Sequence, residues 1–217
     1  MNEANNERPN PLLLKAKQAR YFDELVDLFD QEQPPQIQAN LREIVASAGI
    51  KPGDSVLDVG AGVGVLVPFI EKYGPARIVA CEISPRMLER LREKYPRVEA
   101  HLADIGELDL PDSSIDVIFM NAVFPNLAEK QKVMANCSRM LAPNGRIVIS
   151  HPEGRPFVER LREVVPFPLD PLPTFPKLRR LAKGLPLVLT LYQDRSDLYL
   201  AVLDKAPLDP RRPIGKR

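Results

Sequence analysis

The sequence predicts an α/β fold: a seven-stranded, mostly parallel sheet with helices on both faces, a C-terminal antiparallel β-hairpin and additional N-terminal helices. Five short apolar segments between residues 55 and 150 alternate with helical segments, which is typical of βαβ units. Two more strand-like segments follow, separated only by residues 193–197. A connection this short joins antiparallel strands, because a parallel pair needs a crossover of about a dozen residues or more.

The first two elements are expected to be helices. Apolar residues recur at helical spacing through residues 12–30, and Pro34 marks a break after them. A second helix is expected over residues 36–48, where apolar side chains share one face. Gly49 comes directly after it, in the position where glycine commonly follows a helix.

The strands and the helices between them follow in order. The expected strands are residues 55–59, 77–81, 98–103, 115–120, 146–150, 185–192 and 198–203. The helices expected between the first five strands are residues 63–73, a helix that starts at Pro85, and residues 126–141. Ser84 is a suitable N-cap for the second of these, and Pro85 fits its first position because an N–H there would be unpaired anyway. Pro143, Asn144 and Gly145 are expected to form the turn before the fifth strand.

The length of 217 residues is enough for one main domain with additions, and we expect that domain to cover residues 36–206. Residues 1–35 are expected to be a disordered start and a helix placed to act as a lid, and the Pro- and Arg-rich residues 207–217 a disordered tail. The Pro-rich residues 152–184 are expected to be an insertion that serves as a substrate lid. Its basic run, residues 177–183, predicts either a solvated helix face or contact with a membrane surface or an anionic acceptor.

Composition excludes several classes of protein. The net charge of +1 provides no general attraction to nucleic acid, and no apolar run is long enough to span a bilayer. The polar N-terminus has no apolar segment typical of a signal peptide. Cys81 and Cys137 lie far apart in the sequence, so we expect two buried thiols in a cytoplasmic protein, with neither a disulfide nor a metal site.

The run DVGAGVG, residues 58–64, contains the strongest functional signal because it follows a strand and opens an expected helix. Glycines such as Gly60, Gly62 and Gly64 let the backbone turn tightly and approach a ligand closely, and a helix start adds free N–H groups. A dinucleotide-binding loop would need a third glycine at position 65, where Val65 stands. Asp58 also disfavours a pyrophosphate and suits a ligand that carries a cationic amino group and a sulfonium.

Acidic residues also stand where the next two strands end. Glu82 is placed to accept hydrogen bonds from two vicinal ribose hydroxyls. Asp104 is placed to accept a hydrogen bond from an adenine amino group, with the Ile105 backbone N–H beside it for a ring nitrogen. Each carboxylate taken singly has an equally simple explanation as a solvated loop residue or N-cap. Together they predict a ligand site, because the carboxyl ends of parallel strands meet at one edge of the sheet.

Two histidines differ in their expected roles. His151 follows the fifth strand and faces the predicted cleft, so it is a candidate general base for an acceptor hydroxyl. The alternative is a histidine that caps the strand or orders the next loop. His101 lies within the third strand and is expected to be a packed or surface residue.

The segments VLDVGAGVGVL, VACEISPRML, HLADIGEL, IDVIFMNAVFPNL and LAPNGRIVIS resemble the successive motifs of class I S-adenosylmethionine-dependent methyltransferases. The resemblance covers residues 36–204 and implies a Rossmann-like fold with S-adenosyl-L-methionine as cofactor. It implies a cofactor site made of Asp58 and Gly60 at the methionine end, the loop residues Ala61, Gly62 and Gly64, Glu82 at the ribose, Ile83, Asp104 and Ile105 around adenine, and Asn121 near the methionine.

The motifs are most similar to those of small-molecule and quinone methyltransferases. The run NAVFPN, residues 121–126, departs from the Asn/Asp-Pro-Pro-aromatic motif of enzymes that methylate DNA adenine or glutamine, and therefore disfavours those substrates. The expected reaction is in-line transfer of a methyl group to an O, C or N atom of a small molecule. Three alternatives stay open: an RNA or protein methyltransferase, a catalytically silent cofactor-binding regulatory protein, and a nicotinamide-dependent oxidoreductase, which Val65 and the terminal hairpin disfavour.

Overall fold

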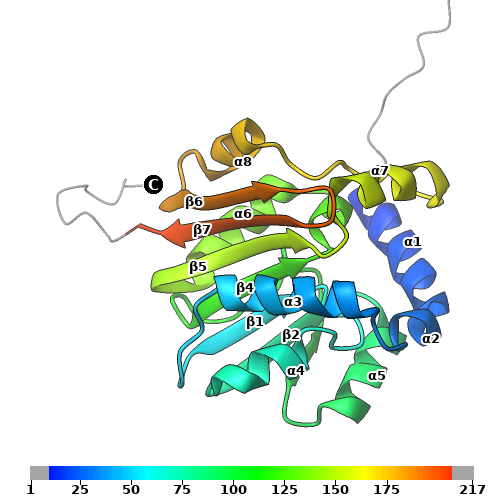
Figure 1. Cartoon of the computed structure of the whole chain (residues 1–217), viewed down its shortest axis with the longest axis horizontal. Helices are drawn as coiled ribbons and strands as arrows, with labels where there is room; N and C mark the ends of the chain where they lie inside the picture. Colours follow the sequence, from blue (N-terminus) through cyan, green and yellow to red (C-terminus); the bar gives the residue numbers. More distant parts are fainter. Residues whose placement is uncertain (1–9, 207–217) are drawn as a thin grey trace, which may run out of the picture.

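The computed structural model describes residues 10–206, so most of the expected disordered start and all of the expected tail lie outside the described part. Seven strands form one sheet in the order β3-β2-β1-β4-β5-β7-β6 (Figure 1). They are β1 (Ser55–Val59), β2 (Arg77–Glu82), β3 (Glu99–Leu102), β4 (Ile115–Asn121), β5 (Leu141–His151), β6 (Leu187–Asp194) and β7 (Tyr199–Lys205). Strands β1 to β5 are parallel, and β7 pairs antiparallel with both β5 and β6. The predicted parallel sheet with a terminal hairpin is confirmed.

Helices cover both faces of this sheet. They are α1 (Pro11–Glu24), α2 (Val26–Phe29), α3 (Pro35–Ser47), α4 (Val67–Ile70), α5 (Pro85–Lys94), α6 (Lys130–Met140), α7 (Gly154–Val164) and α8 (Phe175–Ala182), with short 3-10 turns η1 (Glu71–Tyr73) and η2 (Phe124–Asn126). Because successive strand residues point to opposite faces, the strands contribute to two separate cores. Val56 of β1 packs with α3 and α4, whereas the next residue, Leu57, packs on the side of α6 and α8.

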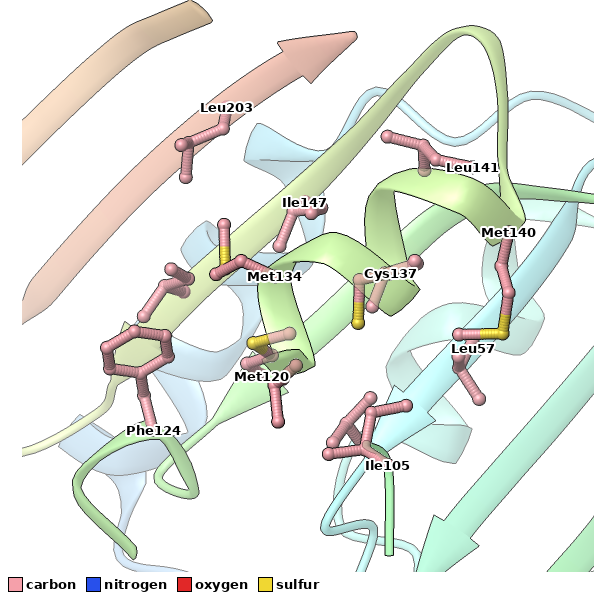
Figure 2. Packing of buried hydrophobic residues seen from close by; sticks show 14 of the residues in the cluster. Leu57, Ile105, Met120, Phe124, Met134, Cys137, Met140, Leu141, Ile147 and Leu203 are labelled. Atoms are coloured by element: carbon pink, nitrogen blue, oxygen red, sulfur yellow. The ribbon is translucent and has the colours of Figure 1, made fainter. Parts of the chain in front are cut away.

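The core on the α6 side is rich in sulfur and branched aliphatic side chains. Figure 2 shows Met134 and Cys137 of α6 packed against Met120 of β4 and Ile147 of β5. All four are less than 1% exposed, so this face of the sheet is dry. Cys81 and Cys137 are both buried and free, as the sequence predicted.

Three predicted helices have different limits from those expected. The segment predicted as one helix over residues 12–30 breaks at Leu25, whose φ of −102° and ψ of 7° are not helical. The helix predicted over residues 63–73 begins only at Val67, because positive φ angles at Gly62 and Gly64 cannot continue into a right-handed helix. The helix predicted from residue 126 begins at Lys130, since Leu127 is extended.

The expected insertion, residues 152–184, divides into two parts. Helix α7 follows β5 directly, whereas α8 packs on β6 and buries Leu178 and Ala182 in the sheet core. Arg155 of α7 forms hydrogen bonds with both carboxylate oxygens of Asp194 on β6. The second half of the insertion is therefore part of the sheet packing.

Helices α1 and α2 lie across the carboxyl ends of the parallel strands (Figure 1). Asp23 accepts hydrogen bonds from the Ser84 hydroxyl at 2.5 Å and from the Arg86 backbone N–H at 3.0 Å. Ser84 also caps α5 by accepting from the Met87 N–H at 3.1 Å, as predicted. Asp30 pairs with Arg90 and Lys94 of α5, so the N-terminal segment is fixed to both the start and the second half of that helix.

Candidate functional site

A cavity of about 540 Å³ lies at the carboxyl ends of the parallel strands, beneath α1, α2 and α7. The cavity brings together nine of the ten predicted cofactor residues, and His151 with them: Asp58, Gly60, Ala61, Gly62, Glu82, Ile83, Asp104, Ile105 and Asn121. They come from five strand ends that are remote in sequence. Gly64 is the exception, because it does not line the cavity.

The glycine loop is held by the strand that lies beside it. The Oε2 atom of Glu82 accepts a hydrogen bond from the Gly62 N–H at 2.9 Å, and Oε1 accepts from Ile83 and Ser84 at 2.8 and 2.9 Å. Gly60 N–H donates to the carbonyl of Cys81 at 2.7 Å. Glu82 is 6% exposed, and burial raises the pKa of its carboxyl while these three backbone N–H groups oppose that shift. The carboxylate expected to bind ribose is thus also the residue that orders the loop.

The loop glycines serve different purposes. At Gly60, with φ of +64°, an added Cβ would lie 2.4 Å from Val123, so only glycine permits that contact. At Gly62, with φ of +54°, an added Cβ would meet no atom nearer than the Met87 sulfur at 3.9 Å. Gly62 therefore leaves open a space that faces the cavity. Gly64 instead allows Tyr95 to pack, since an added Cβ would lie 2.7 Å from its ring.

Asp58 is a buried carboxylate that lacks a donor. It is 3% exposed, and no group within residues 10–206 donates a hydrogen bond to its side chain. Burial, together with the neighbouring Glu82, raises the pKa of Asp58 to about 8. A cationic group placed beside Asp58 would favour its ionised form. The side chain therefore fits the cationic ligand group that its sequence position predicted.

Asp104 already has partners on both oxygens. Oδ1 accepts from the Gly106 N–H at 2.8 Å, and Oδ2 lies 3.2 Å from the ammonium of Lys15 on α1. The same ammonium lies 3.6 Å from Glu107 and 3.9 Å from Glu129. Lys15 thus fixes α1 beside the end of the site that was predicted to receive adenine, a contact that the sequence analysis missed.

Asn121 and His151 complete the edge of the sheet. The Asn121 Oδ1 atom accepts from the Ser150 hydroxyl at 2.9 Å. The His151 Nδ1 atom accepts from the Glu153 backbone N–H at 3.2 Å, which places the proton of the neutral ring on Nε2. Burial lowers the pKa of His151 to about 4, so the ring is neutral at pH 7 and a weak base. The role of general base stays a prediction, and this arrangement disfavours it because the ring nitrogen that could accept a proton already accepts a hydrogen bond.

Sequence reasoning also missed an aromatic wall, which we define as Tyr21, Phe22, Phe157 and Phe167. Tyr21 lies 5.3 Å from Phe167, between ring centroids, in an edge-to-face contact, and Phe22 lies 5.6 Å from Tyr21. Phe157 lies 5.4 Å from the His151 ring. These residues come from α1, from α7 and from the segment after α7, and amphipathic spacing alone does not distinguish such a wall from ordinary core.

Comparison with known proteins agrees with this geometry. A family model described as a methyltransferase domain matches residues 57–149. An arsenite methyltransferase of Halobacterium salinarum is 34% identical over 112 residues, which are 48% of this chain and 29% of that protein. A demethylmenaquinone methyltransferase of Tropheryma whipplei is 36% identical over 110 residues, which are 48% of this chain and 45% of that protein.

A solved structure extends the likeness to the whole fold. Geranyl diphosphate C-methyltransferase of Streptomyces coelicolor, determined with S-adenosyl-L-homocysteine, superposes with a TM-score of 0.71 over 92% of this chain and 100% of that one, at 12% identity. Residues 57–149 are thus a methyltransferase domain of the class I S-adenosylmethionine-dependent type. Its cofactor is accordingly S-adenosylmethionine. The match spans less than half the length of either of the two curated methyltransferases named above.

Two further observations concern the described residues as a whole. Within the described residues, no helix has the length and apolar character needed to cross a bilayer. No group of three His, Cys, Asp or Glu side chains in residues 10–206 is arranged to hold a metal ion.

Proposed function

We propose that the chain transfers a methyl group from S-adenosylmethionine to a small-molecule acceptor that binds in the same cavity. The observation that carries this proposal is the convergence of Asp58, Glu82 and Asp104 around the open space at Gly62. These residues supply acceptors for a cationic amino group, a ribose and an adenine amine, in the order in which those groups follow one another in the cofactor.

In this proposal the cofactor lies along the strand ends from β3 to β4. Asp104 and the Ile105 N–H hold adenine, Ile83 packs on its ring, and Glu82 binds the ribose hydroxyls. Asp58 and the loop around Gly60 and Ala61 hold the amino acid end, with Asn121 on the far side. Asp58 is the only one of these carboxylates with no donor from residues 10–206, and it would gain a cationic partner on binding.

The chemistry needs positioning more than acid–base groups. When bound, S-adenosylmethionine supplies an electrophilic methyl group and a neutral thioether leaving group. The protein therefore has to align the acceptor with that methyl group, and well-oriented reactants gain roughly 7–11 kcal/mol over reactants free in solution. The cover formed by α1, α2 and α7 favours an acceptor small enough to be enclosed, and we propose that these helices act as the lid.

The proposal is tested first by binding and then by transfer. Calorimetry should detect binding of S-adenosylmethionine and S-adenosylhomocysteine, and none of NADH. Radiolabelled cofactor is then offered with small molecules, RNA and protein fractions, and label should enter a small molecule. Tight cofactor binding without label in any fraction would favour a silent regulatory protein, and preferential binding of NADH would refute the cofactor assignment.

A further inference from the structure

The acceptor part of the cavity has its own chemistry, which is separate from that of the cofactor part. Along the sheet order, the proposed cofactor residues end at β4, and the next strand is β5, whose last residue is His151. The cavity residues of α7 and of the segment after it, which follow β5, are mostly apolar: Phe157, Leu161, Val165, Phe167 and Leu169. Phe167 in turn contacts the Tyr21 and Phe22 rings of α1. An acceptor placed next to the methyl group would therefore contact rings and aliphatic chains.

His151 is the polar group that points to a ligand. The side chain is 4% exposed and lines the cavity, and its Nδ1 is occupied by the Glu153 N–H. The Nε2–H has no hydrogen-bond acceptor within residues 10–206. A buried donor of this kind costs free energy unless a ligand pairs with it. The matching ligand atom is an oxygen with a free lone pair, and a protonated amine cannot supply one.

The charged residues of the cavity limit the class of acceptor further. Among the described residues that line it, no lysine or arginine faces the acceptor, since Lys15 pairs with Asp104 at the other end. A diphosphate or carboxylate would lose its hydration there without gaining a cationic side chain. A ligand with a single delocalised oxyanion would lose less, because the positively charged sulfur of the cofactor would lie beside that oxygen.

We propose, as a deepening of the methyltransferase function above, that the acceptor is a planar, apolar aromatic hydroxyl compound, such as a phenol, a naphthol or a hydroxyquinone. It is held between the aromatic wall and the Nε2–H of His151. Edge and face contacts with four aromatic rings suit a flat ring better than a flexible chain.

His151 acts here as a hydrogen-bond donor. The acceptor loses its proton to solvent before reaction, and its oxyanion attacks the methyl carbon. The carbon–sulfur bond breaks as the oxygen–carbon bond forms, and the electron pair of the broken bond goes to sulfur. Opposite charges disappear in this step, so a dry apolar cavity favours it more than water does.

Two variants of one residue separate this role from its alternatives. His151→Gln keeps an N–H donor near the position of Nε2 but has no basic nitrogen, whereas His151→Phe keeps the ring shape without a donor. Binding of 2-naphthol and 4-nitrophenol is measured by calorimetry in the presence of S-adenosylhomocysteine. Wild type and His151→Gln should agree within about threefold, and His151→Phe should bind about tenfold or more weakly, as expected for one buried hydrogen bond.

Affinity for S-adenosylhomocysteine, measured alone, should change by less than about threefold in both variants, and turnover should follow the same order as acceptor binding. Equal acceptor binding by His151→Phe and wild type would overturn the proposal, as would loss of turnover in His151→Gln to the level of His151→Phe. If either variant does not fold, acceptor binding by the wild-type protein still tests the proposal. Binding of N-methylglycine or geranyl diphosphate in preference to both aromatic hydroxyl compounds would refute the aromatic acceptor. Naphthol binding without methyl transfer would count against the methyltransferase function and leave the aromatic site in place.

Discussion

The Oε2 atom of Glu82, the last residue of β2, accepts a hydrogen bond from the backbone N–H of Gly62 at 2.9 Å, 20 residues earlier in the chain. One carboxylate therefore joins two parts of the proposed cofactor site. Its other oxygen accepts from two further backbone N–H groups, of Ile83 and Ser84. Removing Glu82 should consequently disorder the loop as well as remove ribose contacts.

We expect Glu82→Ala to weaken binding of S-adenosylhomocysteine by about 10²-fold or more, because charge-assisted hydrogen bonds contribute roughly 1.5–3 kcal/mol each. It should also lower the melting temperature of the free protein, since three backbone N–H groups lose their acceptor. Glu82→Gln, which keeps one carbonyl oxygen, should give an intermediate loss in both measurements. An unchanged dissociation constant in Glu82→Ala would remove this residue from the cofactor site.

A matched pair of glycines tests whether the loop touches the cofactor. Gly62 and Gly74 have φ angles of +54° and +65°, and an added Cβ at either would meet its nearest neighbour at 3.9 Å. An L-residue at such angles costs roughly 1–2 kcal/mol, so Gly62→Ala and Gly74→Ala should destabilise the fold similarly. Gly62 lines the cavity and Gly74 does not.

We therefore expect Gly62→Ala to weaken cofactor binding by about tenfold or more, while Gly74→Ala binds the cofactor like wild type. Calorimetry gives the affinities, and thermal unfolding gives the stabilities. Equal affinity in the two variants would make the Gly62 loop purely structural.

Whether a part of the site could be predicted from the sequence depends on how far apart in the chain its contacting residues lie. The strands and their acidic ends were predictable because alternation, glycines and strand ends are local signals: Glu82 and Asp104 were found in this way. The contact of Gln18 with the Asn126 carbonyl joins residues 108 apart, and the Lys15 pair with Asp104 likewise joins α1 to a distant loop. No local pattern encodes such pairings, so the contacts that α1 makes over the cavity could be recognised only in the fold.

The sequence left the role of His151 open for a related reason. Its position at the end of β5 was visible in the sequence, and the cavity does include it. The burial of its ring and the hydrogen bond from the Glu153 N–H to Nδ1 depend on how the chain turns into α7. Those two facts decide whether the imidazole offers the cavity a basic nitrogen or an N–H donor, and neither is a property of residue type.

Asp58 predicts a specific pH dependence. Its pKa in the fold is raised to about 8, whereas an unfolded aspartate titrates near about 3.9. A carboxyl whose folded pKa is raised contributes stability below the unfolded value, and this stability is lost as the pH rises towards the folded value. Asp58→Asn should therefore melt at a higher temperature than wild type at pH 8.5, and the difference should shrink towards pH 4.

Asp58→Asn should also weaken binding of the cofactor. A cationic amino group favours ionised Asp58, so wild-type affinity for S-adenosylhomocysteine should rise between pH 6 and pH 8 with release of a proton. Asp58→Asn should bind about tenfold or more weakly at pH 8 and should lose that pH dependence. Calorimetry in buffers of different ionisation enthalpy counts the protons, and equal proton release by the variant would exclude Asp58 as their source.

The last prediction concerns the attachment of α7, which covers the acceptor part of the cavity. Arg155 donates to Asp194 of β6 at 2.7 Å and to the carbonyl of Leu172 at 2.5 Å, and its guanidinium lies 5.7 Å from the centre of the Tyr199 ring. Arg195 makes a comparable two-pronged pair with Glu43, at 2.9 Å for each nitrogen, but the Arg195 side chain is 43% exposed, against 24% for Arg155. The two arginines therefore share a geometry and differ in burial and in the backbone carbonyl that Arg155 also binds.

We expect Arg155→Ala to lower the free energy of unfolding by roughly 1.5–3 kcal/mol, the range for hydrogen bonds to charged groups. Arg195→Ala should cost about 1 kcal/mol or less, because exposed pairs are screened by water. Urea unfolding measures both. Since α7 carries Phe157 and begins three residues after His151, Arg155→Ala should also raise the KM for the aromatic acceptor while cofactor affinity stays near wild type. Equal destabilisation by the two substitutions, with an unchanged KM, would mean that Arg155 is an ordinary surface residue and that α7 is held over the cavity by its apolar contacts alone.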